Sequence, residues 1–118
     1  MALHSTLPIY KVTYQLLVLA TEITRNMPRD FRTSMGAKIR EECLELVILI
    51  YRANSAADKV PHLTRMLERL QVAELLFRLS RDLRLIAVKH YAAAIELTSA
   101  IGKQANGWRK SSATSPAA

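Results

Sequence analysis

Four stretches of this chain carry apolar residues at steps of three and four, and this period constrains the fold more than any other feature. The stretches cover residues 8–26, 33–54, 62–83 and 87–106. Residues three or four apart share one helix face, so each stretch predicts an amphipathic helix. The chain holds only three glycines and four prolines, too few for a turn-rich β fold. The pattern therefore predicts an all-α fold.

The predicted helices have similar lengths and are joined by short connections. Helices of about 18–22 residues would each be roughly 27–33 Å long. These features predict an antiparallel, up-down four-helix bundle. We expect one domain over residues 1–110 and a disordered tail of small, polar residues at 111–118. Residues 84–86 include no glycine or proline, so the third and fourth segments could also form one kinked helix.

The second predicted helix is apolar nearly all round between residues 43 and 51. Thr33 or Ser34 is a plausible N-cap for this helix. A helix with this pattern is covered on more than one side, and a small bundle covers one side well. We therefore expect the bundle to oligomerise. The expected interface residues come from the first and second helices: Tyr10, Tyr14, Leu17, Leu44, Val47, Ile48 and Tyr51.

The chain is strongly basic, with a net charge of +7. This charge indicates a nucleic acid, an anionic membrane surface or an acidic protein partner, or it serves solubility alone. Arginines recur at helical spacing in the third segment with few carboxylates nearby, apart from an expected Glu74–Arg78 pair. A guanidinium group can donate two hydrogen bonds to a phosphate. The residues predicted to contact nucleic acid are Arg65, Arg69, Arg78, Arg81, Arg84 and Lys89.

The sequence offers little for catalysis. It contains no Glu-x-x-His pair, no Gly-x-Ser-x-Gly turn and no glycine-rich phosphate loop. Glu41, Glu42 and Glu45 could serve acid/base chemistry, but a solvated helix face with Lys38 nearby is the simpler interpretation. We expect the single cysteine, Cys43, to pack as a small hydrophobe. No catalytic residue, metal site or cofactor is predicted.

No apolar run approaches the ~20 residues that a membrane span requires, and the first residues lack the pattern of a secretory signal. The expected location is therefore the cytoplasm, and no membrane is expected among the partners.

Residues 100–110 resemble the end of the accessory variability determinant (Avd) proteins of diversity-generating retroelements. In that family the last helix closes with a glycine, a short spacer, a Gly-Gly-Trp-like element and basic residues. Here Asn106-Gly107-Trp108 departs from the paired-glycine form. The resemblance extends over residues 9–110 and also includes Ile9-Tyr10, Met27-Pro28-Arg29, Met35-Gly36, the arginine-bearing residues 76–83 and Lys89-His90-Tyr91.

This resemblance implies a four-helix protomer assembled into a ring-like homopentamer of bacterial or phage origin. It also implies binding to the retroelement reverse transcriptase and its template RNA, as a non-catalytic helper of error-prone copying. Two alternatives stay open. One is a basic bundle that binds an acidic protein partner. The other is a member of the sister group, the bundle proteins encoded in intervening sequences of ribosomal RNA genes.

Overall fold

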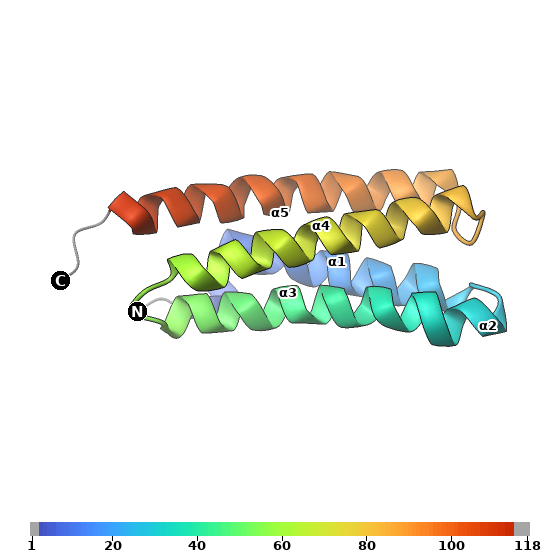
Figure 1. The fold of residues 1–118 in the computed structure, drawn as a ribbon, viewed down its shortest axis with the longest axis horizontal. Coiled ribbons are helices and arrows are strands. Elements are labelled where there is room, and N and C mark those ends of the chain that lie inside the picture. Colours follow the sequence, from blue (N-terminus) through green and yellow to red (C-terminus); the bar gives the residue numbers. More distant parts are fainter. Residues whose placement is uncertain (1–2, 115–118) are drawn as a thin grey trace.

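The computed structural model describes residues 3–114, and helices are the only regular secondary structure over that range (Figure 1). Four long helices make up the fold: α1 (Pro8–Arg25), α3 (Ala37–Ser55), α4 (Val60–Asp82) and α5 (Val88–Thr114). Three short elements accompany them: a 3-10 helix at His4–Thr6, α2 at Arg29–Phe31 and a π-helix at Arg32–Gly36. The prediction of an all-α helical bundle is confirmed.

Each long helix packs against two others, α1 and α4 both against α3 and α5. The chain reverses direction between successive long helices, as Figure 1 shows. The bundle measures 51 × 20 × 18 Å. The α1–α3 connection and the α4–α5 turn lie together at one end, and the α3–α4 connection lies at the other end, with the start of α1 and the end of α5 (Figure 1).

The helix-period stripes form the core, most completely in α4. All six residues of the α4 stripe are buried: Leu63, Met66, Leu70, Ala73, Phe77 and Ser80. In α1 the buried stripe also includes Thr13 and Thr24. A pattern of apolar residues does not predict their burial, because both are polar. Each hydroxyl donates to the carbonyl four residues earlier, at 2.7 Å, so no hydroxyl donor is left unpaired in the core.

The second long helix begins differently from the prediction. Neither Thr33 nor Ser34 is an N-cap, because both lie inside the π-helix, and the Ser34 hydroxyl donates to the Asp30 carbonyl at 2.7 Å. Helical structure starts at Arg29, directly after Pro28. The segment crosses α1 closely at Gly36, where an added Cβ would lie 3.2 Å from the Thr24 Cβ. The close crossing therefore favours glycine at this position, because a larger residue would have to displace Thr24 or the end of the Arg40 side chain.

The α3–α4 connection is fixed by a lysine. The Lys59 ammonium group donates to the carbonyls of Ala53, Asn54 and Ala56 at 2.9–3.3 Å. These carbonyls lie at the end of α3, where backbone donors become scarce, and the Ala53 carbonyl also accepts from the Ala56 N–H at 3.3 Å. A cation at a helix C-terminus also interacts favourably with the helix dipole.

The last helix is longer than predicted. It continues through Gly107 and Trp108 to Thr114, so residues 111–114 are helical rather than part of a disordered tail. Trp108 is partly buried against the core and shares a small apolar hollow with Leu7 and Ile9. This packing holds the final turns of α5, which composition alone did not indicate. Residues 115–118 of the expected tail lie outside the described residues.

Within residues 3–114, no helix combines the length and apolar character needed to cross a bilayer.

Candidate nucleic-acid interface

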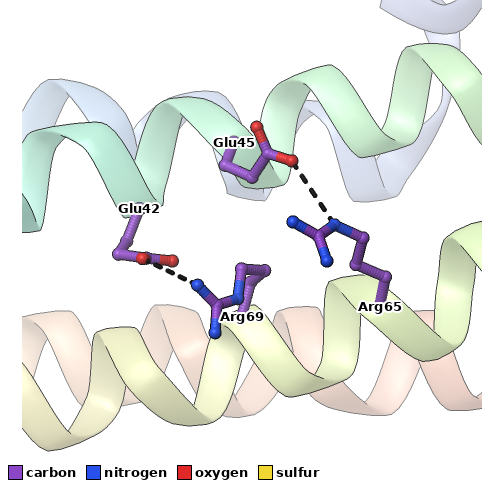
Figure 2. Close-up of polar contacts among 4 residues, drawn as sticks. All are labelled: Glu42, Glu45, Arg65 and Arg69. Atoms are coloured by element: carbon purple, nitrogen blue, oxygen red, sulfur yellow. Dashed lines mark hydrogen bonds and ion pairs between the residues drawn. The ribbon is translucent and has the colours of Figure 1, made fainter.

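Two of the predicted RNA-binding arginines face carboxylates across the α3–α4 contact (Figure 2). The Arg69 Nη1 donates to Glu42 Oε1 at 3.1 Å, and the Arg65 Nε lies 3.7 Å from Glu45 Oε1. The expectation that this cluster is unneutralised is therefore wrong for Arg65 and Arg69. The reason is tertiary: α3 brings its acidic residues opposite α4, and spacing within one helix cannot reveal this. That Arg65 and Arg69 also contact nucleic acid stays a prediction.

The acidic residues of α3 do not form one solvated face. Glu41 is exposed, whereas only 9% of the Glu42 surface is accessible. Glu42 Oε2 is buried without a hydrogen-bond partner among the described residues. Lys38 makes no ion pair with Glu41 or Glu42. Both Glu42 and Glu45 point at an arginine, so they form interhelical pairs instead of a facing carboxylate pair.

Cys43 lies beside Glu42 and is completely buried. Burial raises the pKa of its thiol to about 12, and the charge of Glu42 acts in the same direction. A thiol in this environment is a poor nucleophile at neutral pH. The expectation that Cys43 packs as a small hydrophobe is confirmed.

The other two arginines of α4 differ in their contacts. Arg81 donates twice to Asp82 Oδ1, at 2.8 and 3.1 Å, and its guanidinium carbon lies 4.4 Å from the centre of the Tyr91 ring. The hydrogen bond to Asp82 raises the pKa of Arg81. Arg78 is exposed and makes no ion pair among the described residues. The expected Glu74–Arg78 pair is wrong, because Glu74 instead accepts a hydrogen bond from Thr98 on α5.

Arg84 lies in the turn that separates α4 from α5, in a backbone conformation that glycine usually adopts. Its φ angle is 60°, and it is the one non-glycine residue with positive φ in the described chain. The Leu85 N–H donates to the Ser80 carbonyl and the Arg84 N–H to the Arg81 carbonyl. This is the Schellman motif, with Arg84 at the position after the helix cap. Both Arg84 and the nearby Lys89 are exposed.

The residues predicted to form an oligomer interface lie on α1 and α3 and differ in exposure. Tyr14, Leu44 and Tyr51 are about half exposed, at 51, 48 and 50%. Tyr10, Leu17 and Ile48 are partly buried, and Val47 is buried inside the protomer. Val47 therefore cannot contribute much surface to an interface without rearrangement. The aromatic residues form a cluster in which His4 contacts Tyr10 and Tyr51, and Tyr10 stacks on Tyr14.

A second apolar surface was missed from the sequence. Leu75 and Leu79 on α4 and Leu83 directly after it lie at steps of four and are 40–63% exposed. The same helix also supplies a complete core stripe, so these leucines form a second apolar face. The spacing of four residues is visible in the sequence. The sequence alone did not predict this second face, because the buried stripe already explained why the helix carries apolar residues.

The described residues bring together no group of three or more His, Cys, Asp or Glu side chains that could hold a metal ion. A groove of about 590 Å³ lies between α4 and α5. Its lining mixes carboxylates with cations, including Glu68, Glu74, Lys103 and Arg109. Nothing in this arrangement pairs a nucleophile with a base.

A search of curated proteins found no relative. The model of the family described as bAvd-like matches residues 7–112, which is nearly the whole chain and coincides with the four long helices. This match agrees with the resemblance carried by Met27-Pro28-Arg29, residues 76–83 and the Trp108 ending. The chain therefore belongs to the bAvd-like family.

Proposed function

We propose that this protein is a non-catalytic accessory protein of a diversity-generating retroelement. In this proposal an antiparallel, up-down protomer acts in the cytoplasm, binds the reverse transcriptase and the template RNA, and supports mutagenic reverse transcription. Membership of the bAvd-like family is the observation that carries the proposal. The exposed cations Arg78, Arg84 and Lys89 add support, because no carboxylate among the described residues neutralises them.

We further propose that the protomers assemble into a homopentameric ring. A ring needs a head-to-tail interface, which joins two different surfaces of the same chain. Two apolar surfaces are available: the α1–α3 face around Leu44 and Tyr51, and the α4 leucines from Leu75 to Leu83. Either surface would be unusual for a protein that works as a monomer, since both present several large apolar side chains to solvent.

The oligomer can be tested separately from RNA binding. Light scattering should give a mass about five times the 13.3 kDa of one chain. Leu44→Glu/Tyr51→Glu should dissociate it while circular dichroism stays helical. Ala92→Glu/Ser99→Glu, at exposed positions of α5, is the matched control and should leave the mass unchanged. A monomeric wild type would contradict the proposed ring.

The proposed function itself is tested by binding to RNA and to the reverse transcriptase. Fluorescence anisotropy with labelled RNA should show binding that weakens as salt rises, because each neutralised phosphate releases counterions. Co-purification should show a complex with the reverse transcriptase of the same retroelement. Absence of both interactions would refute the proposal. Binding to the polymerase without binding to RNA would instead favour the alternative, a basic bundle that meets an acidic protein partner.

A further inference from the structure

We propose that RNA lies across one end of the bundle, the end that carries both the α1–α3 connection and the α4–α5 turn, instead of along the face of α4. We define this basic end as residues 25–40 together with residues 78–90. The two segments are far apart in the sequence but lie together at the same end of the molecule (Figure 1). This inference rests on the proposed function, from which it takes RNA as the ligand.

The net charge of the chain is concentrated at the basic end. Its two segments hold nine lysine and arginine residues and two aspartates, a net charge of +7. The whole chain also has a net charge of +7, so the remaining eight cations and eight acidic residues cancel. Glu22 and Glu41 lie just beyond the segment limits, and their inclusion would still leave +5. A neutral body with one strongly basic end directs a polyanion to that end.

Most of these cations are free to bind a ligand. Six are exposed and make no ion pair with a described carboxylate: Arg25, Arg29, Lys38, Arg78, Arg84 and Lys89. The other three are held by the protein. Arg81 binds Asp82, Arg40 donates to Thr24 Oγ1 at 2.8 Å, and Arg32 donates to the Arg25 carbonyl at 3.5 Å. Arg65 and Arg69, in contrast, are paired with glutamates. We therefore place the RNA site at the end of the bundle and not along α4.

The basic end also presents an aromatic ring between cations. Phe31 is 39% exposed and lies in the connection between Arg29 and Arg32. Proteins often bind single-stranded RNA with an exposed aromatic ring and nearby arginines. Bases stack on the ring, and phosphates bind the guanidinium groups. Seven of the nine cations are arginine, which suits phosphate better than lysine does. These features favour RNA over an acidic protein.

The conformation of Arg84 is an independent observation that points to the same place. The turn position that Arg84 occupies favours glycine, and an L-residue there is strained. Strain of this kind concentrates at functional sites, where the side chain is needed despite its cost. Arg84 is exposed at the basic end, so a phosphate contact would account for the choice of residue.

The patch matches a short stretch of nucleic acid. The bundle is 20 × 18 Å in cross-section. At the ~3.4 Å rise per phosphate along the axis of a stacked strand, this width corresponds to about five or six phosphates. The six free cations are therefore similar in number to the phosphates of a stacked strand laid across this end.

The test compares two variants with the same change in charge. Arg29→Glu/Arg78→Glu/Lys89→Glu reverses three exposed cations at the basic end. Arg52→Glu/Lys103→Glu/Lys110→Glu reverses three exposed cations elsewhere and is the matched control. Binding of a labelled, mixed-sequence 20-nucleotide RNA is measured by anisotropy between 50 and 300 mM salt, and light scattering and circular dichroism check assembly and fold.

We expect the basic-end variant to bind RNA at least about ten-fold more weakly than wild type, and the control to stay within about three-fold. The slope of log affinity against log salt should fall by about 2 in the basic-end variant, since each lost phosphate contact removes ~0.7 for a single strand. Equal or greater loss in the control, with wild type binding normally, overturns the inference while leaving the proposed function intact. Wild type that binds no RNA overturns both.

Crosslinking of the wild-type protein gives a second readout that does not depend on a variant folding. RNA that contains 4-thiouridine is irradiated with the protein, and crosslinked peptides are identified by mass spectrometry. Crosslinks in the peptide that contains Phe31, or in residues 78–90, support the inference. Crosslinks confined to the α1–α3 tyrosines Tyr14 and Tyr51 overturn it.

Discussion

Replacement of Arg84 by glycine should stabilise the protein and weaken RNA binding at the same time. Arg84 has a φ of 60° in the turn after α4. An L-residue in this left-handed region is strained by about 1–2 kcal/mol, and glycine is not. Glycine also gains conformational entropy in the unfolded chain, which offsets about 0.4–1 kcal/mol of that relief. The net expectation is a stabilisation of about 0.5–1 kcal/mol.

Urea denaturation followed by circular dichroism measures this change as a higher midpoint with an unchanged m-value. In a chain of this size, the melting temperature should rise by about 2–6 °C. RNA affinity should fall in the same variant because one exposed guanidinium is lost. The two effects have opposite signs, so a loss of binding cannot be attributed to a loss of fold.

Arg84→Ala is the matched control for this experiment. Alanine keeps the strain of the left-handed conformation and removes the guanidinium, so affinity should fall as in Arg84→Gly without a gain in stability. A glycine variant that is less stable than wild type would refute the description of the turn. A glycine variant that is more stable but binds RNA like wild type would refute a functional role for Arg84.

Three further perturbations test the packing of the bundle. Arg69→Met removes the partner of the buried Glu42 and should lower the unfolding free energy, measured by urea denaturation, by about 1–3 kcal/mol. Glu42→Met/Arg69→Met should recover most of that loss. Equal losses in the two variants would show that the ion pair does not determine the effect. Cys43 should resist a thiol reagent at pH 8 until the protein unfolds. Because burial raises its folded pKa to about 12 from 9.0, the stability it contributes should be complete below pH 9 and decline as pH rises toward 12; rapid labelling of the native protein at pH 8 would contradict this. Gly36→Ala should lower the unfolding free energy by about 0.5–2 kcal/mol, because the crowding of its Cβ against Thr24 Cβ and Arg40 Nη1 at 3.2 Å outweighs the ~0.5–1 kcal/mol that alanine gains over glycine in a helix. An unchanged midpoint would mean that the helices move apart easily.

The helices and most of the core could be predicted from the sequence because both depend on local periodicity. The spacing of Leu63, Met66 and Phe77 was sufficient to identify the buried face of α4. The helix boundaries were less accurate. Thr33 and Ser34 looked like caps, yet the chain is already helical there, since the π-helix brings Gly36 against α1. A contact between two helices decided that start, and no local signal reports such a contact.

The candidate site depended more strongly on tertiary structure. The spacing of Arg65, Arg69 and Arg78 correctly placed them on one helix, α4. It gave no reason to expect that some of them are paired with carboxylates and others are free. The fold separates them, because α3 neutralises Arg65 and Arg69 while Arg78 stays free. Arg29 was not among the residues predicted to contact nucleic acid, since it lies in a connection between two helices and outside the helical spacing of the α4 arginines.

The sequence by itself determined that this chain is helical, which faces are apolar and that it carries a charge of +7, because these properties belong to individual residues and their near neighbours. Only the tertiary structure decided where that charge acts. Two connections about 50 residues apart in the chain meet at one end of the bundle, while charges elsewhere cancel. Electrostatic potential sums over space, not along the sequence, so the basic end exists only once the chain has folded.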